Sequence, residues 1–191
     1  MAAVGGSFLA LVMLAGVLLR DRVPPLDSWI VDHLYSAPGT ARATLATTIS
    51  GAGSVFGLVV LLSVVGGIWW RLRGAATGLL LRSGALLATC SSTVVLQTVF
   101  QRPGPAVTDQ DWTYPSGHIV LLAALGGTAV LLSRSLSATW RNAVAGSLIV
   151  MIGLVAASRM TLGEHWLIDV VAALVVTVGS GLVAAIALRL L

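Results

Sequence analysis

The sequence predicts an all-α polytopic membrane protein with six transmembrane helices and a short interfacial amphipathic helix after the first. Hydrophobic residues make up 57% of the 191 residues and charged residues only 9%, and the mean hydropathy is +0.98. Soluble domains carry roughly 25% charged residues, so this composition excludes a soluble globular fold. Disordered and fibrous chains are excluded too, because apolar residues run throughout without a glycine period or a Pro/Ser tract.

Each predicted helix is an apolar stretch between breaks rich in Arg, Pro or polar residues. Residues 2–19 carry their basic neighbours after the apolar run, so we expect a retained helix and not a secretory signal. Two prolines follow, and then Leu26 and Trp29 recur at helical spacing opposite Asp27, as in a helix on the membrane surface. The remaining spans are expected at residues 47–70, 75–100, 119–133, 142–157 and 166–188.

Arginines in short loops predict the orientation of these helices. With the N-terminus inside, five of them fall on the cytoplasmic side: Arg71, Arg73, Arg134, Arg141 and Arg189. All seven acidic residues then fall at or near the outer side, together with loops 101–115 and 158–165. We therefore expect cytoplasmic N- and C-termini, and we expect any chemistry in these loops to face outward.

The basic residues and the single cysteine indicate the source, the binding partners and the crosslinks to expect. All eleven basic residues are arginines, which suggests a GC-rich bacterial genome and an inner-membrane protein. They are scattered, so no nucleic-acid patch is expected. Cys90 is the only cysteine, which excludes an internal disulfide. Residues 1–191 are expected to form one transmembrane domain in the bilayer, and the sequence predicts no oligomeric state.

Two ionisable residues lie inside the predicted spans, where charge is costly and marks a functional candidate. Arg82 lies near the inner end of its span, and we expect it to snorkel to the cytoplasmic surface. Asp169 follows His165 by four residues, which places both on one helix face. A carboxylate there can fix the imidazole tautomer and leave the other nitrogen as nucleophile or base. Alone, this pair equally fits a polar contact between two helices.

Further residues on the expected outer side have the chemistry of an anion site: Arg102, Ser116, Gly117, His118, Ser158 and Arg159. Guanidinium groups suit phosphoryl oxygens. A Ser-Gly helix start adds backbone N–H groups and the positive end of the helix dipole. One histidine can attack phosphorus while the other protonates the leaving alkoxide, and this scheme requires no metal.

These motifs resemble those of the type 2 phosphatidic acid phosphatase superfamily of membrane phosphatases, whose pattern is KxxxxxxRP, PSGH and SRxxxxxHxxxD. The second motif matches at residues 115–118, and the third matches at residues 158–169 in type and spacing. The resemblance implies that His165 is a nucleophile forming a phosphohistidine, with Asp169 as its orienting partner. It implies that His118 is the general acid and later the base. The implied phosphate cradle is Arg159, Ser116 and Gly117.

The first motif departs from the family pattern. If Arg102-Pro103 is the RP of the motif, Val95 stands at the lysine position; in a fuller register of the motif, Gln97 stands there. The lysine is missing either way, and a lost charge-assisted hydrogen bond is worth on the order of 1.5 to 3 kcal/mol. The sequence therefore predicts a site with Arg102 as a phosphate ligand but with one fewer cation than its relatives.

The resemblance implies a metal-independent lipid phosphatase with no cofactor. Its implied substrates are a polyprenyl diphosphate or phosphate, phosphatidylglycerol phosphate, or phosphatidate. A lipid phosphotransferase of the same family is one alternative, and a non-catalytic lipid-binding or transport relative is another. A zinc site built from two histidines and Asp169 is opposed by the neighbouring arginines, and the HExxH signature is absent.

Overall fold

The computed structural model describes the backbone of residues 1–191 and every side chain except those of residues 73 and 74. All regular elements in these described residues are helical, which confirms the predicted all-α class. In chain order they are α1 (Ala2–Leu19), α2 (Pro25–Leu34), α3 (Ala41–Leu72), η1 (Arg73–Ala76), α4 (Thr77–Ser92), η2 (Thr93–Val95), α5 (Leu96–Phe100), α6 (Gly117–Ser133), α7 (Ala138–Thr161) and α8 (Leu167–Ala187).

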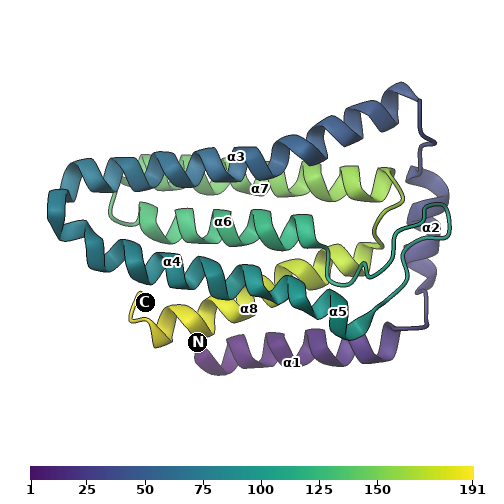
Figure 1. Cartoon of the computed structure of the whole chain (residues 1–191), viewed down its shortest axis with the longest axis horizontal. Helices are drawn as coiled ribbons and strands as arrows, with labels where there is room; N and C mark the ends of the chain where they lie inside the picture. Colours follow the sequence, from purple (N-terminus) through teal and green to yellow (C-terminus); the bar gives the residue numbers. More distant parts are fainter.

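Six helical segments form the membrane bundle. Five are long and apolar enough to cross a membrane: α1, α3, the run from α4 to α5, α7 and α8. The sixth, α6, has 17 residues and rises about 26 Å at 1.5 Å per residue, close to the thickness of a bilayer core. Helix α2 lies across one end of the bundle (Figure 1). The six spans and the short extra helix are thus confirmed.

The predicted boundaries of the fifth span are wrong. Helix α7 covers Ala138–Thr161 instead of residues 142–157, so Ser158 and Arg159 belong to its last turn and not to a loop. The turn after the helix is made at Gly163, whose backbone adopts the left-handed conformation at φ +66°. The helix ends at Thr161, two residues after the arginine and just before this Gly, so α7 carries the Arg159 side chain on rigid backbone.

Helix α6 lies at the centre of the bundle and packs against α3, α4, α7 and α8 (Figure 1). This position explains why apolar side chains surround it on all sides. Small residues allow close packing: a Cβ on Gly57 of α3 would lie 2.9 Å from the side chain of Leu122 on α6. Helix α1 packs along α8, where a Cβ on Gly5 would lie 2.8 Å from the carbonyl oxygen of Gly179.

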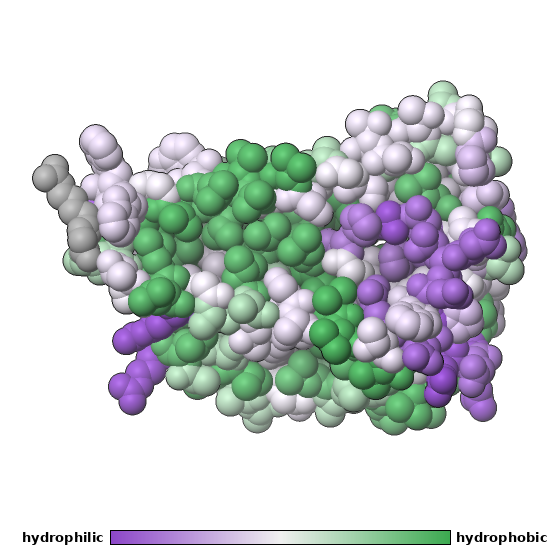
Figure 2. All heavy atoms as spheres, in the orientation of Figure 1, coloured by the Kyte–Doolittle hydropathy of each residue, from purple (hydrophilic) through white to green (hydrophobic). Residues whose placement is uncertain are grey.

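Polar residues gather at the ends of the bundle. Figure 2 shows apolar side chains over the middle of the face and the larger polar group at the α2 end. Both termini lie at the opposite end (Figure 1), where Arg71 donates a 2.8 Å hydrogen bond to the carbonyl oxygen of Ser135. The side chain of Arg73 lies outside the described residues. Arg82 is exposed on α4, as snorkelling requires.

Candidate active site

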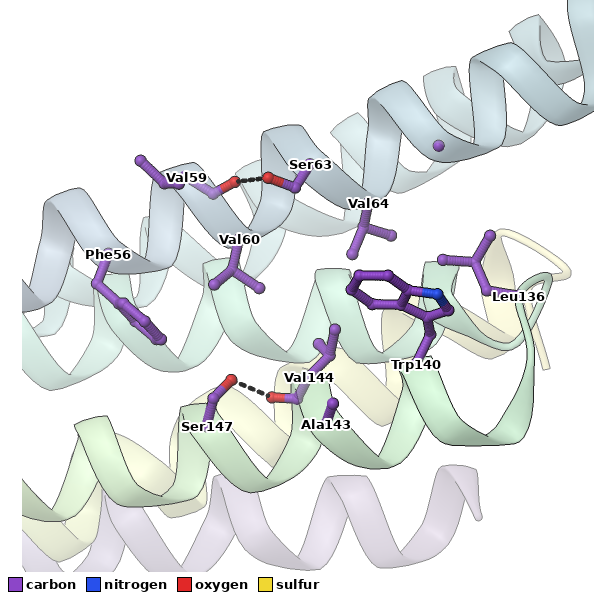
Figure 3. Close-up of a pocket in the computed structure, with 11 residues that line it drawn as sticks. Phe56, Val59, Val60, Ser63, Val64, Leu136, Trp140, Ala143, Val144 and Ser147 are labelled. Atoms are coloured by element: carbon purple, nitrogen blue, oxygen red, sulfur yellow. Dashed lines mark hydrogen bonds between the residues drawn. The ribbon is translucent and has the colours of Figure 1, made fainter.

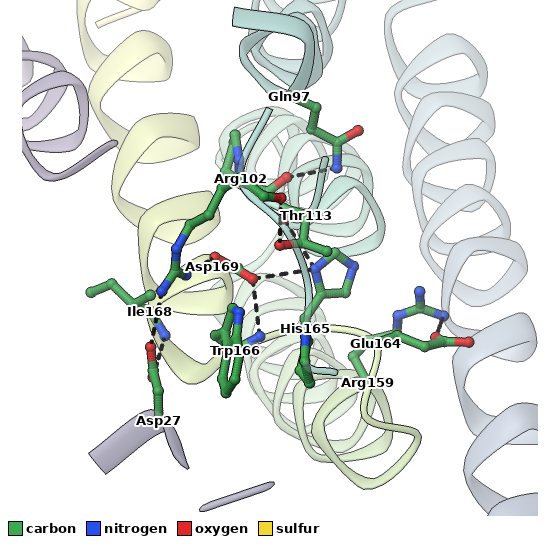
Figure 4. Close-up of polar contacts among 12 residues, drawn as sticks. Asp27, Gln97, Arg102, Thr113, Arg159, Glu164, His165, Trp166, Ile168 and Asp169 are labelled. Atoms are coloured by element: carbon green, nitrogen blue, oxygen red, sulfur yellow. Dashed lines mark hydrogen bonds and ion pairs between the residues drawn. The ribbon is translucent and has the colours of Figure 1, made fainter. Parts of the chain in front are cut away.

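His165, in the loop before α8, is held by a backbone carbonyl. Its Nδ1 lies 3.0 Å from the carbonyl oxygen of Thr113 and 3.8 Å from Oδ2 of Asp169 (Figure 4). A carbonyl only accepts, so in the neutral ring this contact places the proton on Nδ1 and leaves the lone pair on Nε2. The sequence predicts Asp169 as the orienting partner, but the closer partner is Thr113. Sequence reasoning missed this group because every residue has a carbonyl.

Asp169 is fully buried in the first turn of α8 and joins three segments of the chain. Its Oδ2 accepts a 2.9 Å hydrogen bond from the backbone N–H of Trp166, and Oδ1 accepts a 2.6 Å bond from Arg102. Its backbone carbonyl oxygen accepts the N–H of Ser116 at 3.1 Å. The start of α8 is thereby tied to the start of α6, so the loop that carries His165 and the helix that carries His118 share one anchor.

Arg102 is bound differently from the phosphate ligand that the sequence predicts. Its side chain is 1% exposed, and besides Asp169 it donates to the carbonyl oxygens of Leu19 at 2.9 Å and Arg22 at 3.1 Å. All three guanidinium nitrogens therefore have protein partners. Arg102 binds Oδ1 of Asp169, whereas His165 faces Oδ2. The structure thus brings Arg102 to the carboxylate behind the expected nucleophile.

Asp27 of α2 is a member of this cluster that sequence reasoning missed. The spacing of Leu26 and Trp29 places Asp27 on a water-facing side, yet Asp27 is 2% exposed while those two residues are 57% and 55% exposed. Its Oδ1 accepts the N–H of Ile168 at 3.2 Å, and its Oδ2 lies 3.5 Å from Arg102. Burial raises the pKa of Asp27, and the Ile168 hydrogen bond and Arg102 oppose that rise. On a membrane helix the apolar face can meet lipid, so the polar face turns to the protein.

Two buried donors at the site lack a protein partner. Ser116 precedes α6, is fully buried, and makes no hydrogen bond through its Oγ. Arg159 is 8% exposed, and its Nε also has no partner. The other contacts of Arg159 are a 3.2 Å hydrogen bond from Nη1 to Ser50 Oγ and an ion pair with Glu164. Because buried polar groups are normally satisfied, these two donors are available to the acceptor oxygens of a ligand.

The first turn of α6 brings Gly117 and His118 to the same place. His118 is partly buried and lies close enough to Arg159 and His165 for their charges to interact with its own. Backbone N–H groups at this helix start have no partner within the helix and can bind an anion. The structure thus groups these two residues with both unpaired donors and the expected nucleophile.

The structure favours one of the two registers for the missing lysine. Val95 is 58% exposed, whereas Gln97 donates a 2.8 Å hydrogen bond from Nε2 to the carbonyl oxygen of Pro115. A Cβ added to Gly117 would lie 3.5 Å from the same Nε2. Gln97 therefore lies beside the start of α6, where it supplies a neutral amide and not a cation.

Among the side chains that the structure describes, no group of three or more His, Cys, Asp or Glu residues is arranged to hold a metal ion. Both carboxylate oxygens of Asp169 already bind N–H groups, those of Arg102 and Trp166. The carboxylate of Asp169 is therefore engaged by the protein and not arranged with the two histidines to bind zinc.

A helical membrane bundle with a buried histidine beside unpaired anion-binding donors defines a membrane protein with a candidate phosphoryl-transfer site. The family model of the PAP2 superfamily matches residues 79–189, more than half of the chain, and the chain belongs to this superfamily. It is similar to the crystal structure of the first transmembrane PAP2 type phosphatidylglycerolphosphate phosphatase from Bacillus subtilis, at a TM-score of 0.68 and 20% identity over 94% of this chain and 93% of that chain. That likeness shows the fold. The search of curated proteins found no match.

Proposed function

We propose that this chain is a lipid phosphatase that hydrolyses a phosphomonoester or diphosphate of a membrane lipid through a phosphohistidine. One observation carries the proposal: the unpaired donors of Ser116 and Arg159 lie in the same site as His165, whose Nε2 is free to attack. Phosphoryl oxygens would satisfy both donors. Membership of the PAP2 superfamily supports the same chemistry.

The proposed reaction has two steps at one phosphorus atom. In the first step, Nε2 of His165 attacks phosphorus, the bond to the lipid oxygen breaks, and protonated His118 gives its proton to that oxygen. In the second step, neutral His118 takes a proton from water, the water oxygen attacks phosphorus, and the P–N bond breaks. Orthophosphate leaves, and His165 regains its lone pair on Nε2.

Two kinds of charge must be stabilised in these steps: negative charge on the phosphoryl oxygens and positive charge on the ring of His165. Arg159 and the start of α6 stabilise the phosphoryl oxygens. The ring of His165 becomes cationic when its Nε2 is phosphorylated, and its Nδ1–H still donates to Thr113 at 3.0 Å. Asp169, 3.8 Å from the same nitrogen, stabilises that cation.

An apolar groove between α3 and α7 supports a lipid substrate. Its volume is about 560 Å³, and the side chains lining it include Phe56, Val60, Val64, Trp140 and Val144 (Figure 3). Ser50, which binds Arg159, lies six residues before the groove begins on α3, about 9 Å at 1.5 Å per residue. We propose that the tail of the substrate lies in this groove while its phosphate meets His165.

The distribution of charge supports an outward-facing site in a bacterial inner membrane. Arg71 and Arg134 lie at the end of the bundle that carries both termini, and the site lies at the other end (Figure 1). All seven acidic residues lie at the site end, so the opposite end carries the excess of positive charge, and by the positive-inside rule that end is cytoplasmic. The substrate classes to test are a polyprenyl diphosphate or phosphate, phosphatidate, and phosphatidylglycerol phosphate. The last of these appears in the name of the similar Bacillus subtilis protein.

Phosphate release by the purified full-length protein in detergent and excess chelator tests this proposal. We expect release from at least one of these lipids, and no release by His165→Ala. His33→Ala is the matched control, because His33 is exposed on α2 and this variant should keep the parent rate. Turnover retained by His165→Ala would contradict the proposal.

A further inference from the structure

Four charged or ionisable side chains form a continuous buried series that ends at the expected nucleophile. Asp27 lies 3.5 Å from Arg102, Arg102 lies 2.6 Å from Asp169, and Asp169 lies 3.8 Å from His165 (Figure 4). Their side chains are 3% exposed or less except that of His165, at 5%. Water therefore screens these contacts little, and each charge acts on the next.

The sum of these charges determines what His165 experiences. Arg102 alone would neutralise Asp169, and a neutral pair stabilises a cationic ring weakly. With Asp27 ionised, the three groups carry a net charge of −1. The other charges near His165 are Arg159 and Glu164, which pair with each other, and His118. Asp27 thus supplies the excess negative charge on the side of the ring that becomes cationic.

The backbone holds Asp27 in register with Asp169. Ile168 donates its N–H to Oδ1 of Asp27 at 3.2 Å, and this residue directly precedes Asp169 in the first turn of α8. Arg102 is fixed independently by the carbonyl oxygen of Leu19, at the end of α1. The carboxylate of α2 is therefore placed by the same helix start that carries the carboxylate beside His165.

We infer that Asp27 is a positioning residue for the reaction proposed above: through Arg102 it leaves Asp169 with the negative charge that stabilises the phosphorylated His165 ring. The inference rests on the proposed function. Asp27 touches neither substrate nor reacting atoms, so it acts on the chemical step and not on substrate binding. Its loss should lower kcat and leave KM unchanged.

The test compares Asp27→Asn with the parent and with Asp32→Asn, which makes the same change on the exposed side of α2. We expect Asp27→Asn to lower kcat about ten- to a hundredfold with KM unchanged, and Asp32→Asn to match the parent. Burial raises the pKa of Asp27 in the folded protein above its value in the unfolded chain. The contribution of Asp27 to the free energy of unfolding is therefore fully present below the unfolded pKa and is lost as pH rises through the folded pKa. The neutral amide should therefore leave Tm at pH 7 unchanged or higher. Asp27→Glu should restore kcat to within about threefold of the parent, since it restores the charge.

A kcat of Asp27→Asn within about twofold of the parent overturns the inference, while an inactive parent or an active His165→Ala overturns the proposed function instead. If Asp27→Asn lowers Tm or fails to fold, the comparison is made between Arg102→Gln and Arg102→Gln with Asp27→Asn. Without Arg102 the carboxylate of Asp27 has no cation to offset. Adding Asp27→Asn to Arg102→Gln should therefore change kcat less than about twofold. A further tenfold loss on that background contradicts the inference.

Discussion

Replacing Arg102 by Gln removes the cation that the structure places against two buried carboxylates. The side chain is 1% exposed, Asp169 is 0% exposed, and the N–O distance between them is 2.6 Å. Breaking a buried ion pair on one side costs about 3–5 kcal/mol, because the other charge is left uncompensated. Hydrogen bonds to the carbonyl oxygens of Leu19 and Arg22 are weakened or lost as well. We expect Arg102→Gln to lower Tm by roughly 10 °C.

The kinetic effect of Arg102→Gln follows from the same contacts. Asp169 loses one of its two anchors, so the ring of His165 is held less firmly and kcat falls about a hundredfold. Substrate binding is unaffected, because Arg102 binds Asp169 and backbone carbonyls and not the phosphate, so KM stays the same. Thermal unfolding in detergent and initial rates of phosphate release measure both quantities.

The matched control is Arg82→Gln, which removes an exposed arginine of α4. It should keep the Tm and the kcat of the parent. A raised KM with unchanged Tm and kcat for Arg102→Gln would refute this reasoning, since it is the signature of a phosphate ligand.

Three further substitutions test other parts of the site. Gln97→Lys restores a cation beside the helix start, so the inhibition constant of orthophosphate should fall about tenfold, and no change would place Gln97 outside the phosphate site. In Gly104→Ala, the added Cβ would lie 2.7 Å from the carbonyl oxygen of Gln110. The loop that carries Thr113 must then shift, and kcat should fall about tenfold. A fully active variant would contradict this role for the loop. Ala143→Trp fills the α3–α7 groove and should raise KM for a long-chain lipid but not for a soluble phosphate ester. Ile149→Trp, on the exposed surface of α7, serves as its control, and equal KM values for both variants would exclude the groove.

Most of the fold follows from the sequence because a bilayer permits few solutions. Apolar runs of sufficient length must be helices, and the six spans and the interfacial helix are found as predicted. The error at the end of α7 has a local cause. Ser158 and Arg159 look like a polar break, but a polar residue in the last turn can face a site instead of water. The turn is made by Gly163, at φ +66°.

The site is predicted in part, and the missing part has a physical reason. Residue types with a chemical signature, such as His118, His165 and Arg159, can be found by spacing, and the structure brings them together. The carbonyl of Thr113 has no signature. Asp27 carries one, but its burial depends on the apolar face of α2 turning outward, which composition alone does not determine.

The partner of Arg102 depends on tertiary structure in the same way. In sequence it stands in a motif that predicts a phosphate ligand, yet its guanidinium reaches the end of α1 and the start of α8. The packing of α1 along α8 brings those two helix ends together. A motif predicts the residue type, and the fold decides which acceptor that residue meets.

Trapping the covalent intermediate tests the central claim most directly. The purified protein is mixed with its ³²P-labelled lipid substrate in chelator and quenched in alkali, where phosphohistidine survives, and the labelled residue is then mapped. We expect the label on His165 in the parent. We expect more of it in His118→Ala, because this variant slows the hydrolysis of the intermediate. Release of labelled phosphate with no label on His165, or with the label on another residue, would contradict the proposed mechanism.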